Sequence, residues 1–188
     1  MKGKLYLIPV PIHNEEDFNI DYTPPYIINT VNKIKIFAVE NIRTSRRFLR
    51  NINPKYDIDG TTFEVINKKS KTNDIVRILD YLLNGNDVGV MSESGCPGIA
   101  DPGQKICEKA HQNQISIKPL IGPSSILLAL MASGLNGQKF QFHGYLPINS
   151  KERINAIKKL KPDTGSHIFI ETPYRNQKVF DEIIKVLK

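Results

Sequence analysis

The residues best suited to holding a ligand are the twelve from Ser92 to Gly103, which read SESGCPGIADPG. They include three glycines and two prolines, and they stand between a β-type run at Asp87–Met91 and a helical stretch at Lys105–Gln112. Glycine lets a backbone approach a ligand closely, and proline fixes φ and removes a hydrogen-bond donor. Ligands of open α/β sheets bind where the strands end. The segment therefore predicts a binding loop, with an ordinary strand-to-helix turn as the alternative.

Two further strand ends carry turns of the same kind. The first predicted strand stops at Pro9–Pro11, and the fifth stops at Ile121–Ser125, which reads IGPSS. In a parallel sheet these carboxyl ends share one edge, so their loops can line one crevice. Neither a G-x-G-x-x-G nor a G-x-x-x-x-G-K-[ST] pattern is present, which argues against a nicotinamide or ATP site. Small polar loops suit a ligand with a ribose, a base and a zwitterionic tail, a description that fits S-adenosylmethionine.

Strand-like and helix-like segments alternate along most of the chain. The helix at Thr72–Leu83 has Thr72 or Asn73 as its expected N-cap and Asn84-Gly85 at its end. This alternation predicts an α/β fold with a doubly wound, mostly parallel sheet. The predicted strands are Leu5–Val10, Lys35–Val39, Thr61–Ile66, Asp87–Met91 and Ile115–Leu120, and the predicted helices are Pro24–Lys33, Ile42–Asn51, Thr72–Leu83, Lys105–Gln112 and Ser124–Ser133.

A second, smaller and incomplete α/β domain is predicted after the first. We place the N-terminal α/β domain with its ligand-binding loops at residues 1–146 and the start of the C-terminal domain at residues 147–188. About 40 residues is near the lower limit for independent folding, so this part must dock, complete itself in an oligomer or be cut short. Its expected elements are an aromatic strand at Phe140–Pro147, a basic helix at Ser150–Leu160 capped by Asn149 or Ser150, a strand at Ser166–Glu171 and a helix at Gln177–Lys188.

The net charge of +7 is unevenly distributed. The stretch Asn41–Lys55 carries four arginines and one lysine without an acidic residue. A basic surface attracts phosphates through counterion release, so RNA is a natural partner. A solvated face that keeps the protein soluble is the alternative.

Composition also bears on location and on metals. The chain has no apolar run of about 18 residues, its N-terminus lacks a signal-peptide pattern, and Cys96 and Cys107 have no metal-type spacing. We expect a cytoplasmic protein with reduced thiols, no membrane association and no metal.

Six segments together resemble the tetrapyrrole methylase superfamily, and within it the branch that methylates the ribose 2′-oxygen of a cytidine in small-subunit ribosomal RNA. The order and spacing of the matches agree from Leu5 to about Arg175. The loop departs from the SDAGTPLISDPG style at Glu93 and Cys96, and Asn41 and Ile42 replace the Asp and Thr of the AEDTRHTR style. The matching segments are Leu5–Ile12, Val39–Arg46 (VENIRTSR), Ser92–Gly103, Ile121–Ser125, Phe142–Pro147 (FHGYLP) and Ile170–Arg175 (IETPYR).

The resemblance, combined with the shared crevice, implies a site for S-adenosylmethionine as methyl donor. Pro9 would shape the floor of the cleft, and Ile170 would close it from the second domain. Ser124 and Ser125 precede a helix, where free N–H groups and a hydroxyl can hold the polar parts of the donor. The residues expected to contact the donor from the loop after the fourth strand are Ser94, Gly95, Cys96 and Ile99.

The resemblance also implies an acceptor and an assembly. Arg43 and Arg46, one turn apart, are expected to hold RNA phosphate. Glu40 is the candidate general base for a 2′-hydroxyl, with Glu93 second. The family pattern implies a homodimer. Two other functions stay open, namely methylation of a tetrapyrrole or another small molecule, and RNA binding without catalysis.

Overall fold

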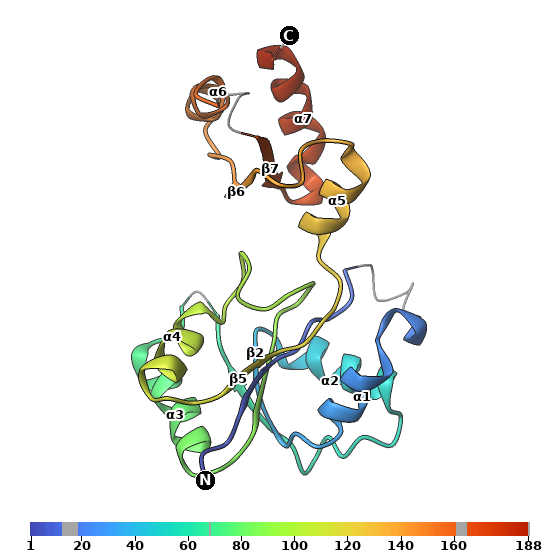
Figure 1. Ribbon diagram of the computed structural model, residues 1–188, viewed down its shortest axis with the longest axis vertical. Helices are drawn as coiled ribbons and strands as arrows, with labels where there is room; N and C mark the ends of the chain where they lie inside the picture. Colours follow the sequence, from blue (N-terminus) through green and yellow to red (C-terminus); the bar gives the residue numbers. More distant parts are fainter. Residues whose placement is uncertain (13–18, 68, 161–164, 188) are drawn as a thin grey trace. The chain divides into compact units, whose positions relative to one another are not determined.

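The computed structural model describes residues 1–12, 19–67, 69–160 and 165–187 (Figure 1). Their contacts group them into two compact units, Met1–Ser124 and Ser125–Lys188. The domain boundary expected at residues 146 and 147 falls inside the second of these units and stays a prediction. Within the described ranges, no helix is long and apolar enough to cross a membrane.

The first unit is built on a five-stranded sheet in the order β3-β2-β4-β1-β5. All of its strand pairs are parallel, which confirms the predicted α/β class. The strands are β1 (Leu5–Leu7), β2 (Ile36–Val39), β3 (Thr62–Val65), β4 (Val88–Met91) and β5 (Ile117–Pro119), and the helices are α1 (Pro25–Val31), α2 (Ile42–Ile52), α3 (Thr72–Leu83) and α4 (Gln104–Gln112), with a 3₁₀ turn η2 (Ile20–Tyr22) before α1.

Each face of this sheet is covered by its own pair of helices (Figure 1). Helices α3 and α4 pack on one face around Val88 and Val90, and α1 and α2 pack on the other around Phe37. Strands β1 and β2 therefore lead to helices on one face, while β4, which lies between them, leads to α4 on the opposite face. The sheet is doubly wound, and the loops after β1 and β4 leave these neighbouring strands toward opposite faces of the sheet. Such a switch point is where open α/β sheets bind ligands.

The end of strand β1 and the N-cap of helix α3 differ from the sequence expectation. Strand β1 ends at Leu7, since Ile8 still donates to the Val90 carbonyl at 2.9 Å but Pro9 has no N–H to continue the ladder. Helix α3 has the predicted bounds, yet its N-cap is Lys71 and not Thr72 or Asn73. The Asp74 carboxylate accepts the Lys71 backbone N–H at 2.8 Å, and this contact makes Lys71 the capping residue, while the helix itself still begins at Thr72.

The second unit contains a two-stranded parallel sheet with a small core. Asn149 caps α6 as expected, accepting the Lys151 N–H at 2.9 Å. Helix α7 begins at Pro173 and not at Gln177, because proline suits the first helical position. The elements are α5 (Ser125–Ser133), β6 (Phe140–Tyr145), α6 (Ser150–Lys158), β7 (Ser166–Ile170) and α7 (Pro173–Leu187).

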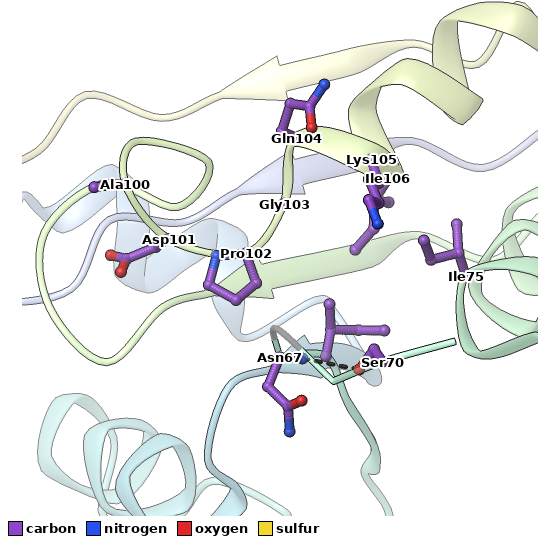
Figure 2. Close-up of a pocket in the computed structure, with 11 residues that line it drawn as sticks. Asn67, Ser70, Ile75, Ala100, Asp101, Pro102, Gly103, Gln104, Lys105 and Ile106 are labelled. Carbon is purple, nitrogen blue, oxygen red and sulfur yellow. Dashed lines mark hydrogen bonds between the residues drawn. The ribbon is translucent and has the colours of Figure 1, made fainter. Parts of the chain in front are cut away.

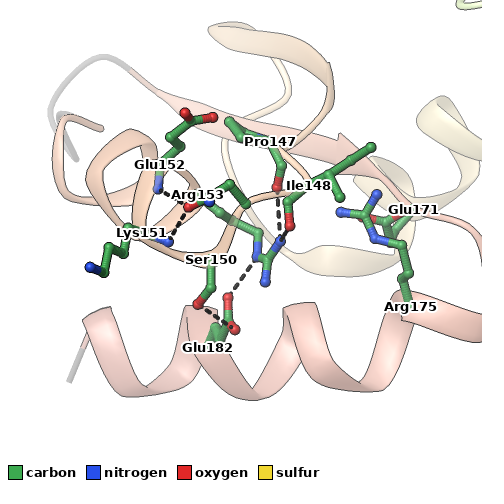
Figure 3. Close-up of polar contacts among 10 residues, drawn as sticks. Pro147, Ile148, Ser150, Lys151, Glu152, Arg153, Glu171, Arg175 and Glu182 are labelled. Carbon is green, nitrogen blue, oxygen red and sulfur yellow. Dashed lines mark hydrogen bonds and ion pairs between the residues drawn. The ribbon is translucent and has the colours of Figure 1, made fainter.

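A buried arginine ties the segment before α6 to α7 (Figure 3). The side chain of Arg153 is only 2% exposed, and its Nε donates to Glu182 at 2.6 Å. Its Nη1 donates to the carbonyls of Pro147 and Ile148, each at 2.8 Å. The hydrogen bond and charge of Arg153 hold the pKa of the Glu182 carboxyl below its ordinary value. One guanidinium thus fixes the path of the chain after the FHGYLP segment.

Candidate functional site

The loop after β1 is joined to the loop after β4 by a two-residue antiparallel bridge. Val10 donates to the Gly95 carbonyl at 2.9 Å, and Gly95 donates to the Val10 carbonyl at 3.1 Å. Gly95 has φ of +68°, a conformation that side-chain-bearing residues rarely adopt, and a Cβ there would lie 3.4 Å from Cγ2 of Ile12. The two loops therefore meet at a residue whose backbone conformation favours glycine.

The loop after β5 packs on both of these loops. A Cβ on Gly122 would lie 2.3 Å from Cγ of Pro9, so the proline ring and the glycine backbone are in direct contact. The Cys96 thiol donates to the Pro123 carbonyl at 3.3 Å, and burial raises the pKa of this thiol, which keeps it a donor. The three loops that the sequence placed at one sheet edge are thus in contact there.

Tyr26 on α1 also reaches the loop after β5, a contact that sequence reasoning did not predict. Its hydroxyl donates to the Ile121 carbonyl at 2.8 Å and accepts the Ile121 backbone N–H. The two residues are 95 positions apart, and Tyr26 belongs to no recognisable motif. No signal in the sequence could have paired them.

The remaining predicted donor residues fall into two groups. In the first unit, the Ser94 carbonyl accepts from the Ser92 hydroxyl at 3.1 Å, the Ile99 N–H donates to the Cys96 carbonyl at 3.3 Å, and Ser124 is half-buried. In the second unit, Ser125 begins α5 and Ile170 ends β7. The donor-binding roles of all these residues stay predictions.

Glu40 follows β2 directly, at the same sheet edge. The preceding residue, Val39, pairs with Met91, so Glu40 and Ser92 begin neighbouring loops. This register brings the predicted general base to the edge where the three loops meet.

The predicted phosphate-binding arginines lie on α2, which starts just after Glu40. Asn41 caps this helix by accepting the Arg43 N–H at 2.9 Å. Arg43 is exposed, whereas Arg46 lies 3.5 Å from Asp59 in an exposed ion pair. Such surface pairs are weak, and the phosphate-binding roles of both arginines stay predictions.

A separate cavity of about 190 Å³ lies at the far end of the loop after β4. Figure 2 shows Asn67 and Ser70 lining one side and the segment from Ala100 to Ile106 lining the other. The Ser70 hydroxyl accepts the Asn67 N–H at 2.9 Å. Among the residues that the structure describes, the cavity lining contains none of the predicted donor-binding residues, although Ala100 to Gly103 belong to the same loop.

Comparison with known proteins identifies the family. The family model described as Tetrapyrrole (Corrin/Porphyrin) Methylases, a family that uses S-adenosylmethionine as methyl donor, matches residues 4–188. A protein named Ribosomal RNA small subunit methyltransferase I from Halalkalibacterium halodurans is 32% identical over 186 residues, which cover 99% of this chain and 61% of that protein. Proteins of the same name are 33% identical in Hydrogenobaculum sp., with 92% and 70% covered, and 30% identical in Vibrio cholerae, with 97% and 60% covered.

The chain thus spans about 60% of the length of two of these relatives. The family model nevertheless matches nearly every residue, and the three-loop arrangement lies within the matched range. The predicted resemblance is confirmed, and the chain belongs to the tetrapyrrole methylase family.

Proposed function

We propose that this protein transfers a methyl group from S-adenosylmethionine to a ribose 2′-oxygen of small-subunit ribosomal RNA. The observation that carries the proposal is the contact among three loops at the switch point of the sheet, centred on the Val10–Gly95 bridge. The relatives named Ribosomal RNA small subunit methyltransferase I support the acceptor.

In the proposed donor site, the loop after β4 acts as a surface for close approach. Both backbone groups of Gly95 bond to Val10, so the donor would pass over Gly95 and form its hydrogen bonds with Ser94 and Cys96. Pro9, held against Gly122, would form the floor. The other contacts within the first unit would come from Ile99 and Ser124, while the donor-binding roles expected of Ser125 and Ile170 in the second unit stay predictions.

The chemistry requires positioning more than a reactive protein group. When bound, the donor supplies an electrophilic methyl group on a sulfonium; the methyl–sulfur bond breaks as the oxygen–methyl bond forms, leaving a thioether. Alignment of the two reactants within a dry cleft can provide much of the rate. Glu40 would accept the proton that the 2′-hydroxyl loses, with Glu93 as the alternative base.

The acceptor would be held through its phosphates by α2. Arg43 and Arg46 lie one turn apart on this helix, in a stretch without acidic residues. Since Glu40 immediately precedes Asn41, the N-cap of this helix, a phosphate held there would place its nucleotide near the proposed base.

The dimer expected for the family is also proposed for this chain. Helix α5 has no buried residue, and Leu127, Leu128 and Met131 are 52%, 49% and 80% exposed. Contiguous apolar surface of this kind favours association. We propose that a second copy of the chain covers α5.

The function is tested with labelled S-adenosylmethionine and small ribosomal subunits isolated from cells that lack the modification. We expect label in the RNA at a linkage that resists alkali, because a 2′-O-methyl group blocks alkaline cleavage. Glu40→Gln should lower the rate about a hundredfold without changing donor affinity. Label transferred to a tetrapyrrole but not to RNA would contradict the acceptor, and salt-sensitive RNA binding without transfer would contradict the enzymatic function.

A further inference from the structure

We propose that Tyr26 is a positioning residue for the methyl donor, because its hydroxyl fixes the peptide of Ile121 and thereby the loop that leads to Ser124. This inference rests on the proposed donor site. It extends that site to helix α1, which contains none of the residues expected to touch the donor.

The contact is made to the backbone of Ile121 and not to its side chain. The Tyr26 hydroxyl donates to the Ile121 carbonyl at 2.8 Å and accepts the Ile121 N–H, so it satisfies both backbone groups of one residue. Ile121 is 80% exposed as a residue and contributes little packing of its own. The conformation of the loop at this position therefore depends on the tyrosine.

The three consecutive residues from Ile121 to Pro123 are each held by a different part of the first unit. Tyr26 holds Ile121, the ring of Pro9 packs on Gly122, and the Cys96 thiol donates to the Pro123 carbonyl at 3.3 Å. Pro9 and Cys96 are themselves proposed donor contacts. Tyr26 is the anchor that comes from outside the donor surface, so its removal should change the orientation of the loop while leaving the donor contacts in place.

A second tyrosine supplies a matched control for the loss of one hydroxyl. Tyr56 is 4% exposed, and its hydroxyl donates to the Ile34 carbonyl at 2.6 Å in the core beneath α1 and α2. Tyr56→Phe removes the same kind of tyrosine-to-backbone hydrogen bond away from the three loops. It reports the effect on stability alone.

The test measures binding of S-adenosylhomocysteine by calorimetry to the unsubstituted protein, Tyr26→Phe and Tyr56→Phe, together with urea unfolding. One lost hydroxyl that made two backbone hydrogen bonds should weaken binding about three- to tenfold in Tyr26→Phe. Tyr56→Phe should lower the unfolding midpoint and leave the dissociation constant unchanged. Unchanged binding in Tyr26→Phe, or equal weakening in both variants, would overturn the proposal.

Amide exchange followed by NMR separates this inference from the proposed function. In Tyr26→Phe the Ile121 N–H should lose protection, while the Ile34 region keeps its own. If the Ile121 N–H is equally protected in the unsubstituted protein and in Tyr26→Phe, the tyrosine does not anchor the Ile121 peptide. If the Tyr26–Ile121 contact is confirmed but the unsubstituted protein binds no S-adenosylhomocysteine, the proposed donor site is refuted. The positioning role of Tyr26 is then refuted as well, because it depends on that site.

Discussion

Val10 and Gly95 exchange both of their backbone hydrogen bonds, at 2.9 and 3.1 Å, although they follow different strands of the sheet. The bridge forms where β1 and β4 lie side by side and their loops leave toward opposite faces. It joins the loops after β1 and β4 at the switch point through backbone hydrogen bonds alone. A donor resting there would meet a surface that is organised before it binds, which reduces the ordering that binding must impose.

Phosphate recognition by α2 predicts a defined salt dependence. Arg43→Ala should reduce the slope of RNA affinity against salt concentration by about one, and Arg43→Ala with Arg46→Ala by about two, because each lost phosphate contact releases one fewer counterion. Donor affinity should not change. The control is Arg77→Ala, since Arg77 pairs with Glu64 at 2.9 Å and lies on α3. Filter binding over a salt series measures the slope of RNA affinity against salt concentration in each protein. An unchanged slope in the double variant would refute phosphate binding by α2.

The paired histidines of the second unit predict a loss of stability in mild acid. His143 Nε2 lies 2.8 Å from His167 Nδ1, and the His143 ring stacks on Phe169. Burial first, and then the neighbouring His167, lower the pKa of His143 below its ordinary value. The unfolded chain therefore binds this proton more readily than the folded one, so stability is complete above about pH 6.5 and falls as pH drops below it.

Urea unfolding of His143→Gln across this pH range tests the assignment. In His143→Gln the free energy of unfolding should depend less on pH than it does in the unsubstituted protein. In His111→Gln, at an exposed position on α4, the pH dependence of that free energy should be the same as in the unsubstituted protein. An identical pH dependence in His143→Gln would show that another group is responsible.

Burial should make Arg153 far more important to stability than Arg46. Arg153→Ala removes one partner of a buried ion pair and strands two carbonyls, and should destabilise the second unit by about 3 kcal/mol. Arg46→Ala removes an exposed pair and should cost less than about 1 kcal/mol. The double variant Arg153→Met/Glu182→Leu should recover much of the loss. Thermal unfolding measures all three, and equal effects of the two alanine variants would contradict the account.

Association through α5 is checked by sedimentation velocity. The protein should be a dimer at tens of micromolar, and Met131→Asp should dissociate it because a charge replaces an apolar residue that is 80% exposed in the single chain. Val76→Asp, at an exposed apolar position on α3, should leave the dimer intact. If the unsubstituted protein sediments as a monomer at this concentration, the proposed dimer is refuted.

Local sequence signals predicted most of this fold because most of its elements are specified locally. Helix α3 has the predicted bounds, and Asn149 caps α6 as expected. The errors are local as well: Asp74 moves a cap to Lys71, and Pro173 starts α7 before the predicted Gln177. The contact between Tyr26 and Ile121 joins residues 95 positions apart through one hydroxyl, and no periodicity encodes such a pair. The contact of the three loops was predictable from the sequence, but the Tyr26 anchor was not.

Calorimetry with S-adenosylhomocysteine on two glycine variants tests whether the three loops bind a methyl donor. Gly95 and Gly134 have nearly equal φ values of +68° and +70°, so alanine costs each position about 1–2 kcal/mol of backbone strain. Only Gly95 lies among the three loops, and a Cβ on Gly134 would meet no atom within 4 Å. We predict that the unsubstituted protein and Gly134→Ala bind equally, and that Gly95→Ala binds about tenfold more weakly or not at all. Absence of binding by the unsubstituted protein at millimolar ligand, or equal affinities in all three proteins, would show that the three loops are not the donor site.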